Sequence, residues 1–532
     1  MKKENQTQEE KKSCKKASKC KEKVQKEKKC KTKTSQTVEK KVCFDNELYL
    51  KLQTEQINKR IKKFHNKLYV EFGGKIFDDL HAARVLPGYD ANVKIKVLQK
   101  MKEKVEIIFC ISSNDIEKHK VRADLGLSYD NEVLRLVDNL REIGLYVSAF
   151  VITLYKGQPS ATKFAKKLEL RGERVYFHNY TKGYPNDVDT IVSDEGYGAN
   201  PFIETTKPLV VVTAPGPSSG KLATCLSQLY HEYKRGVKAG YAKFETFPVW
   251  NLPLKHPANI AYEAATADLQ DVNQIDPFHF NAYGKLAVNY NRDIAVFPIL
   301  QSITTKIMGK EVYKSPTDMG VNMIAESLKD DSVCQVAAKK EIFRRYYRAE
   351  CDYKRGQATF ETLERNKFLV SEVKADKSLL PAIDVAKKAA KDSGYPCIAL
   401  ELPNGEIVTG KTKTIVSASG AVILNALRTL ANLGDDFDVI TDDILLPIVE
   451  YRTKILKSHS SVLTLDDVMV ALSICSGKNE KAKKAMEQIT NLKGCDAHCT
   501  YILPTSEEQT LKKFGVNVTC EPVYLNANLF ED

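Results

Sequence analysis

Apolar positions between Phe44 and about Gly236 form short runs that alternate with stretches of helical spacing. The runs predict strands at 67–72, 105–111, 145–154, 174–179, 189–193 and 209–214, with helices near 92–104, 130–143 and 160–171. Near-continuous apolar strands separated by helices are typical of a parallel sheet covered on both faces. Residues 43–236 are therefore expected to form an α/β domain with a mostly parallel sheet.

The pattern changes twice further along the chain. Residues 237–377 contain few apolar runs and several well-capped helical stretches, which predicts a mostly helical domain. From 378 to 532 the alternation returns, with a hairpin at 397–410, a helix at 417–433 and short strands at 439–442 and 501–504. The last third is expected to be a mixed α/β C-terminal domain.

The basic charge of the chain is concentrated at its N-terminus. Residues 1–41 hold 16 Lys and 6 Glu, or +10, of the net charge of +13, which leaves +3 for the other 491 residues. Residues 1–42 contain almost no large apolar side chains, so they predict a disordered Lys-rich tail. A solvated arm is favoured over a weak contact with nucleic acid or an anionic membrane.

The rest of the composition indicates a cytoplasmic protein. No stretch approaches the ~18 apolar residues of a membrane span, and the N-terminus lacks the apolar segment of a secretion signal. The 13 cysteines are an odd number without paired spacing, which favours reduced thiols. A homo-oligomer remains open.

The segment 209–224, LVVVTAPGPSSGKLAT, carries the clearest chemical signal. A buried strand leads into a Gly/Pro/Ser loop, and Lys221 opens a helix. The free N–H groups and positive dipole end of a first helical turn favour a phosphate, so the predicted phosphate ligands in this loop are Gly216, Ser218, Ser219, Gly220 and Lys221. A tight turn without a ligand is the alternative.

The same loop departs from the P-loop pattern G-x-x-x-x-G-K-[ST]. Pro215 stands at the first glycine and Leu222 at the hydroxyl residue that holds Mg²⁺. A standard P-loop NTPase is therefore the less favoured interpretation. In the C-terminal part, Gly410, Lys411 and Thr412 spell the end of the same motif, but their hairpin context indicates a turn.

Two further loops are expected at the same sheet edge, because ligands of parallel sheets bind at the carboxyl ends of strands. Gly73, Gly74 and Lys75 follow the first strand and are candidate phosphate ligands, although a plain turn is an equal alternative. Asp194 and Glu195 follow the fifth predicted strand and are candidate Mg²⁺ ligands or substrate contacts.

Residues 255–284 combine seven charged or histidine side chains with little apolar mass. Such a segment could supply a catalytic wall, with Glu263 and Asp268 as the candidate catalytic residues beside Lys221, or it could be a solvated helix. Near the C-terminus, GCDAHC places ligand-like residues close together, which leaves a zinc site open: Cys495, His498 and Cys499, with Cys520 as a fourth ligand.

Long segments of the chain resemble one family of uncharacterised bacterial proteins, domain of unknown function 1846 (uncharacterised protein family 0371). The resemblance rests on LYVEFGGKIFDDLHAARVLPG, DVDTIVSDEGYG, the run from VVVTAPGPSSGK to NLPLKHP, YEAATADLQDVN, YKSPTDMGVNM and KFGVNVTCEP, and it covers about 44–532. It implies a cytosolic protein with an α/β, a helical and a second α/β part. It implies no activity, and so no catalytic residues.

Taken together, these patterns predict a phosphate- or nucleotide-binding enzyme of phosphotransferase or ligase type that uses the PGPSSGK loop, Mg²⁺ and a small phosphorylated substrate. A regulatory protein that senses a phosphorylated metabolite is the first alternative, and a zinc-dependent hydrolase at GCDAHC is the second.

Overall fold

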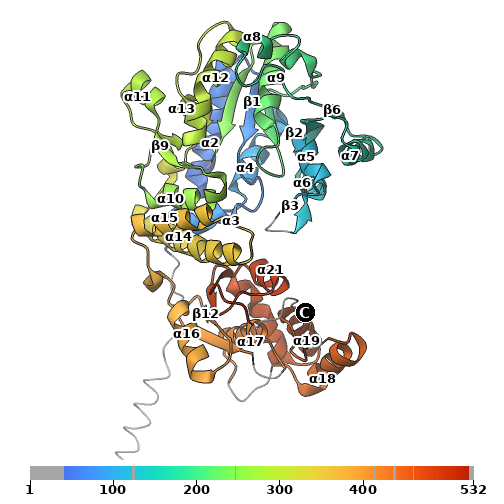
Figure 1. The fold of residues 1–532 in the computed structure, drawn as a ribbon, viewed down its shortest axis with the longest axis vertical. Helices are drawn as coiled ribbons and strands as arrows, with labels where there is room; N and C mark the ends of the chain where they lie inside the picture. The colour runs from blue at the N-terminus through green and yellow to red at the C-terminus, as the bar shows by residue number, and fades with distance from the viewer. Residues whose placement is uncertain are drawn as a thin grey trace, which may run out of the picture.

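The structure is a computed structural model that describes residues 41–122, 126–245, 247–412, 415–434, 439–458 and 460–525. The prediction of a disordered tail at 1–42 lies almost wholly outside these residues. The described chain forms two parts, with helices α14 (Asp331–Lys354) and α15 (Phe360–Glu372) lying between them (Figure 1). The α/β fold class is confirmed.

The N-terminal part is built on one sheet of seven strands in the order β11-β8-β1-β7-β2-β5-β6. Every neighbouring pair in it is parallel. Its strands are β1 (Leu68–Phe72), β2 (Val105–Ser112), β5 (Tyr146–Thr153), β6 (Val175–Phe177), β7 (Leu209–Thr213), β8 (Gly240–Phe244) and β11 (Gly320–Val321). The central ones are wholly buried because helices cover both faces.

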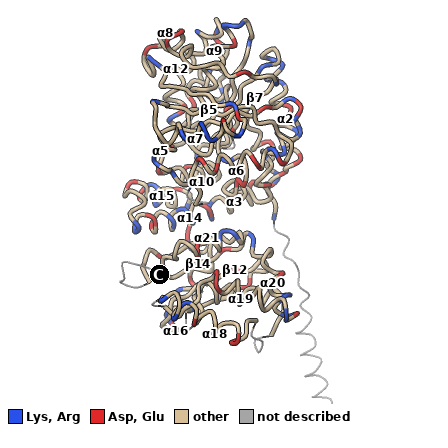
Figure 2. The backbone as a smooth tube through the Cα atoms, turned by 90° about the vertical axis from the view of Figure 1, so that its right-hand side faces the viewer, with Lys and Arg blue, Asp and Glu red and all other residues tan. Residues whose placement is uncertain are grey.

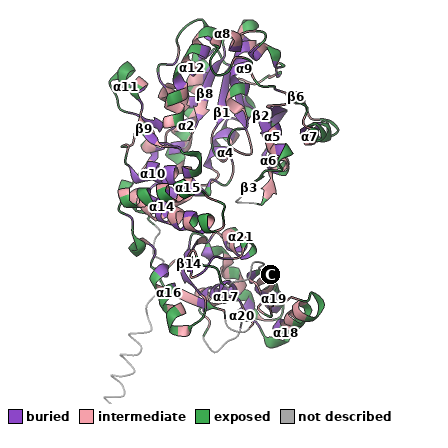
Figure 3. Cartoon of the chain, in the orientation of Figure 1, coloured by how far each residue is buried: buried purple, intermediate pink, exposed green. Residues whose placement is uncertain are grey.

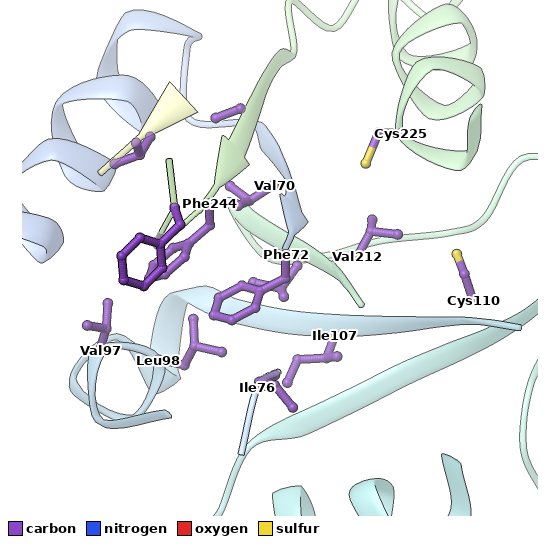
Figure 4. Close-up of a cluster of buried hydrophobic side chains, with 14 of the residues drawn as sticks. Val70, Phe72, Ile76, Val97, Leu98, Ile107, Cys110, Val212, Cys225 and Phe244 are labelled. Atoms are coloured by element: carbon purple, nitrogen blue, oxygen red, sulfur yellow. The ribbon is translucent and has the colours of Figure 1, made fainter. Parts of the chain in front are cut away.

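Packing around β1 shows the two covered faces. On one face the rings of Phe72 and Phe244 stack with centroids 4.3 Å apart, next to Val97 and Leu98 of α4 (Val93–Lys100) (Figure 4). On the other face the Tyr69 hydroxyl donates to Glu232 of α9 (Lys221–Lys234) at 2.7 Å. The alternation of side chains along a strand therefore puts Glu71 on the α9 face.

The remaining helices of the N-terminal part pack around the sheet or extend it towards α14. They are α2 (Asn46–Lys63), α3 (Leu80–Val85), α5 (Ser113–Glu117), α6 (Tyr129–Glu142), α7 (Pro159–Glu169), α8 (Val188–Ile191), α10 (Pro257–Ala265), α11 (Pro277–Tyr283), α12 (Asn291–Met308) and α13 (Pro316–Met319). Two small antiparallel pairs accompany them: β3 (Val121–Arg122) with β4 (Leu127–Ser128), and β9 (Asn273–Ile275) with β10 (Val288–Tyr290).

Two features of the N-terminal part differ from the sequence pattern. The sheet does not stop at residue 236, because β8 and β11 join it from the region expected to be helical. Residues 189–193 are not a strand: Asp187 accepts the Thr190 N–H and caps the short helix α8. A run of five residues is too short to distinguish the two structures by periodicity alone.

The C-terminal part has its own four-stranded sheet in the order β13-β12-β14-β15. It contains α16 (Ala382–Ser393), β12 (Cys397–Glu401), β13 (Ile407–Lys411), α17 (Ala418–Leu430), α18 (Asp442–Glu450), α19 (Leu465–Ser476), α20 (Glu480–Met486), β14 (Asp496–Cys499), α21 (Thr505–Lys513) and β15 (Asn517–Cys520). The predicted hairpin is the antiparallel pair β12–β13, and the predicted helix is α17. The segments 439–442 and 501–504 are not strands.

Buried and exposed residues separate cleanly in both parts, and each has its own apolar core (Figure 3). The two parts meet through ionic contacts from α14: the Arg344 Nη2 donates to Asp496 Oδ1 at 2.6 Å, and both side chains are about 90% buried. Basic and acidic positions are interspersed along α14 and α15 (Figure 2).

Candidate functional site

The loop after β7 leaves the start of helix α9 uncapped. Gly220 is the N-cap residue with φ 80°, and it has no side chain to accept a hydrogen bond from the first turn. The backbone N–H groups from Ser218 to Ala223 have no hydrogen-bond acceptor among the described residues. An uncapped first turn with several free donors is the arrangement by which helices bind anions.

Two side-chain hydroxyl groups hold the shape of this loop. The Ser219 hydroxyl is buried and donates to the Gly216 carbonyl at 2.7 Å. The Thr153 hydroxyl at the end of β5 donates to the Ser219 carbonyl at 2.8 Å. The Gly216 and Ser219 carbonyl oxygens are therefore bound inside the loop, whereas the backbone N–H groups at the start of α9 remain as donors.

The two loop glycines are needed for packing. A Cβ on Gly216 would lie 2.4 Å from the Tyr129 Oη, and a Cβ on Gly220 would lie 2.8 Å from the Thr153 Cβ. Gly220 also needs the left-handed backbone region that glycine adopts most readily. The loop therefore packs closely against β5 and α6, and its shape depends on the absence of side chains at both positions.

Lys221 is the first residue of α9 and is partly buried. None of the ion pairs or hydrogen bonds of the described residues includes its ammonium group. A lysine at the positive end of a helix dipole is unfavourable unless an anion lies nearby. An anion bound at the start of α9 would therefore be stabilised by both the helix dipole and the Lys221 ammonium group.

The loop after β1 is held more tightly by the protein itself. The Gly73 N–H donates to the Phe244 carbonyl at 2.9 Å, so it is not free for a phosphate. Gly74 has φ 67°, and Lys94 beside it forms a buried ion pair with Asp79 at 2.7 Å. Of the three residues predicted here as phosphate ligands, Gly73 is explained as a structural turn residue.

Both loops open into one large cavity of about 2750 Å³ between the two parts of the molecule. Typical ligand pockets are about 300–1000 Å³, so only a portion of this cavity would hold a small ligand. The predicted residues that line it are Gly73, Gly74, Lys75, Gly216, Ser218, Ser219, Gly220, Lys221 and Asp268. The C-terminal part contributes Lys493 and Asn517, among others.

The strand order places these loops where parallel sheets bind ligands. The chain leaves β7 towards β8 but leaves β2 towards β5, so the crossovers from neighbouring β7 and β2 run in opposite directions. The same holds for the neighbours β8 and β1. Such switch points open crevices at the carboxyl ends of the strands.

Asp194 and Glu195, predicted as Mg²⁺ ligands, lie at the wrong end of α9. Asp194 accepts hydrogen bonds from Tyr230 at 2.7 Å and from Lys234 at 2.8 Å, in the last turn of the helix. A helix of 14 residues is about 20 Å long, so this carboxylate is far from Lys221. Glu195 pairs with Lys182 at the surface. Residues 189–193 do not form the predicted strand, so Asp194 and Glu195 do not follow a strand end at the carboxyl edge of the sheet.

Glu263, predicted to be catalytic, is buried and does not line the cavity. It forms an ion pair with Arg365 and accepts from the Asn273 side chain at 2.9 Å, which ties α10 to α15 and β9. Of the two candidate acids in residues 255–284, Asp268 alone lies on the cavity wall.

The GCDAHC segment does not assemble a zinc site. His498 uses both ring nitrogens, on Thr519 at 2.9 Å and Glu521 at 3.0 Å. Cys495 Sγ donates to the Asn491 carbonyl at 3.7 Å, while Cys499 and Cys520 are register partners in β14 and β15. Over the ranges that the structure describes, no three His, Cys, Asp or Glu side chains are grouped to hold a metal.

Besides the two loops, the cavity wall contains a cluster of polar side chains that the sequence pattern did not predict to lie close together. Lys243 at the end of β8 bonds Glu245 at 2.6 Å and Asp293 at 2.8 Å. On β1, Glu71 accepts from the Tyr241 hydroxyl at 2.8 Å. All five residues line the cavity.

The environment of this cluster changes its protonation. Burial raises the pKa of Glu245 to about 7, an effect that the neighbouring Lys243 only partly offsets. Burial raises the pKa of Asp271 above its ordinary value; the Arg292 charge offsets part of this rise and the Asp293 charge adds to it. Carboxyl groups with raised pKa values that face a cavity are typical of functional sites.

Comparison with known proteins decides the family. A model described as "Domain of unknown function DUF1846, N-terminal" matches residues 42–374, and one described as "Domain of unknown function DUF1846, C-terminal" matches 378–530. The chain belongs to this family. It is 55% identical over 499 residues to a "UPF0371 protein" of Clostridium tetani (strain Massachusetts / E88), covering 92% of this chain and 99% of the relative.

A second relative extends the same picture. The "UPF0371 protein" of Clostridium botulinum (strain Langeland / NCTC 10281 / Type F) is 54% identical over the same length, again covering 99% of that protein. The resemblance predicted from the motifs is confirmed. Within the described part of the DUF1846 chain, no helix has the length and apolar character needed to cross a membrane.

Proposed function

We propose that this DUF1846 protein is a phosphate-dependent enzyme of phosphotransferase or ligase type that binds its phosphate compound at the start of α9. The observation that carries the proposal is the row of backbone N–H groups from Ser218 to Ala223 that have no acceptor among the described residues. Lys221 adds an ammonium group without an ionic partner there, at the wall of the cavity.

The arrangement suits phosphoryl chemistry because such reactions depend mainly on positioning and charge neutralisation. The N–H row would hold the phosphate oxygens, and Lys221 would neutralise part of their charge. Since Pro215 and Leu222 replace two P-loop positions, the site differs from a standard NTPase loop. A nucleotide or a simpler phosphate compound is compatible with it.

The role proposed for Mg²⁺ changes with the structure. Asp194 and Glu195 do not fit it, since they pair with Lys234 and Lys182 away from the cavity. Mg²⁺ is often bound through substrate phosphates with few protein ligands. In the proposal it therefore arrives with the phosphate compound.

Thermal shifts with ATP, GTP, sugar phosphates and pyrophosphate, each with and without Mg²⁺, test the proposal. At least one phosphate compound is expected to raise the melting temperature of the native protein. Lys221→Ala should weaken its affinity about 10- to 100-fold, the loss of one hydrogen bond to a charged group. Lys411→Ala is the matched control, because Lys411 is an exposed lysine that also follows a glycine.

The outcomes separate the proposal from its alternatives. If no phosphate compound stabilises the native protein, or if Lys221→Ala and Lys411→Ala behave alike, the α9 site is wrong. If Lys221-dependent binding is found without turnover of any compound over long incubation, the protein is a binding module that senses a phosphorylated metabolite.

A further inference from the structure

The cavity contains two buried polar atoms that the protein leaves without partners. The Tyr290 hydroxyl and the Asp271 Oδ1 have no hydrogen bond within the described chain, and both residues are only 3% exposed. Both line the cavity. An unsatisfied buried polar atom costs about 1–3 kcal/mol, so the free protein carries a cost at this place that a ligand can remove.

The unpartnered atoms belong to the cluster at the ends of β8 and β1. The acidic groups Glu245, Asp271 and Asp293 all lie close enough to influence the ionisation of Tyr290. Lys243 bonds two of these acids, and Arg292 lies 3.4 Å from the Asp271 Oδ2. Carboxylates therefore outnumber cations, and Glu71 adds another carboxylate within reach of Lys243.

This chemistry favours hydroxyl groups as the ligand. A hydroxyl both donates and accepts hydrogen bonds, so it can donate to the Asp271 Oδ1 or to Glu245 and accept from Tyr290 or Lys243. A second phosphate is unfavourable beside this excess of carboxylates. The neutral, multiply hydroxylated portion of a sugar or polyol satisfies the most groups at once.

The cluster is on the same side of the sheet as the anion site. Glu71 lies on the α9 face, and its register partners on the neighbouring strands are Lys243 and Val212. From β8 to β7 is two strand spacings, or about 10 Å. An extended five- or six-carbon polyol phosphate spans such a distance.

We infer that the cluster around Tyr290, Asp271 and the Lys243–Glu245 pair is a subsite for the hydroxyl groups of a sugar or polyol phosphate whose phosphate binds at the start of α9. This inference rests on the proposed function, because it needs the phosphate site. It narrows the substrate class from any phosphate compound to a polyhydroxylated phosphate monoester.

The test compares ligands that share a phosphate but differ in hydroxyl groups. Affinities are measured for glucose 6-phosphate, sorbitol 6-phosphate, ribose 5-phosphate, butyl phosphate, inorganic phosphate and ATP. At least one hydroxylated monoester is expected to bind 10-fold or more tightly than butyl phosphate. Tyr290→Phe and Glu245→Gln should each reduce that ratio at least threefold while leaving the affinity for inorganic phosphate unchanged.

A matched variant separates a ligand contact from a packing effect. Tyr49→Phe removes another buried tyrosine hydroxyl that has no hydrogen-bond partner among the described residues, but Tyr49 does not line the cavity. It should leave the ratio unchanged. Melting temperatures of all three variants show whether each one is folded.

Failure of the inference differs from failure of the proposed function. If phosphate binding depends on Lys221 but hydroxylated monoesters bind no better than butyl phosphate, the subsite is wrong and the phosphate site stands. Tight binding of ATP alone, insensitive to Tyr290→Phe, also overturns the subsite. If inorganic phosphate, ATP and the monoesters all fail to bind, the phosphate site itself is wrong.

Discussion

Each part of the molecule contains a Gly-Lys pair that resembles the end of a P-loop, Gly220-Lys221 in one and Gly410-Lys411 in the other, and the two pairs have different surroundings. In the N-terminal part Gly220 and Lys221 lie between a parallel strand and a helix, next to N–H groups without acceptors. In the C-terminal part Gly410 and Lys411 belong to the antiparallel strand β13 and pair with β12. A candidate anion site is therefore distinguished by backbone N–H groups that have no acceptor in the protein, as at the start of α9, and not by the dipeptide itself.

The glycines show the same contrast. A Cβ on Gly410 would lie 2.1 Å from the Val422 nitrogen, because α17 packs directly on β13. Gly220 instead has a backbone with positive φ that ends the loop against Thr153. Gly410 permits the close packing of α17 on β13, whereas Gly220 shapes a loop that faces the cavity.

The largest loss of stability is expected from removing the buried ion pair between the two parts. Arg344→Ala removes a buried partner of Asp496 and of Glu341. The loss is expected to be about 3 kcal/mol, the lower end of the cost of breaking a buried ion pair, because Lys340 still pairs with Asp496 and Arg84 with Glu341. Urea unfolding should show this loss. Lys367→Ala, which removes an exposed ion pair with Glu364, should change stability little. An equal small loss in both variants would contradict the role given to the Arg344–Asp496 contact.

Adding a methyl group at either glycine, in Gly410→Ala or Gly220→Ala, should lower the free energy of unfolding by about 1–3 kcal/mol. Only Gly220→Ala should also remove the stabilisation by a phosphate compound, since it alters the loop that presents the N–H groups. If Gly410→Ala abolishes that stabilisation in a folded protein, or Gly220→Ala retains it, the assignment of the two glycines is reversed.

A pH effect should follow from Glu245. Its native pKa of about 7 lies above its ordinary value of 4.5, so ionisation disfavours the folded state. The stability that Glu245 contributes is full below about pH 4.5 and is lost as the pH rises towards 7. Lys243, Asp293 and Glu71 face this carboxyl group and remain in the variant.

Glu245→Gln should therefore gain stability relative to the native protein between pH 5 and 7.5, with no further gain above that range. Thermal unfolding across this pH range measures the difference. A constant difference would show that the pKa of Glu245 is not raised in the folded protein.

The smallest effect is expected for metal content. Purified protein should contain no stoichiometric zinc, and Cys495→Ser with Cys499→Ser should not change the metal analysis. His498→Ala should reduce stability, because it removes a buried hydrogen-bond partner of the Thr519 hydroxyl and of the Glu521 carboxylate. Zinc that is present in the native protein and lost in the cysteine variant would restore the zinc-site hypothesis.

Much of the fold could be predicted because the buried strands are continuous apolar runs such as Leu209–Thr213. The α9 loop could also be located, since the change from strand to helical spacing is local. The pattern does not predict strand β8, because Gly240–Phe244 is only five residues long and contains a glycine and a lysine in place of a continuous apolar run. Its omission concealed Lys243 and Glu245.

The polar cluster could not be predicted from any one motif. Its members come from β1, from β8 and the residue after it, from the segment before β9, from the end of β10 and from the start of α12. They meet because the strand order brings β1 beside β8, which is decided by the packing of the whole sheet. Conversely, Glu263 and His498 looked reactive in the sequence, but their partners Arg365 and Glu521 are distant along the chain.

The most direct test of the central claim is a crystal structure of the protein grown with tungstate, whose position anomalous scattering identifies. We predict one tungstate within hydrogen-bond distance of the backbone N–H groups between Ser218 and Ala223 and close to the Lys221 ammonium. We expect no tungstate there in Lys221→Ala. The proposed anion site would be contradicted if tungstate bound only elsewhere, or if the crystal structure showed these N–H groups hydrogen-bonded to other groups of the protein.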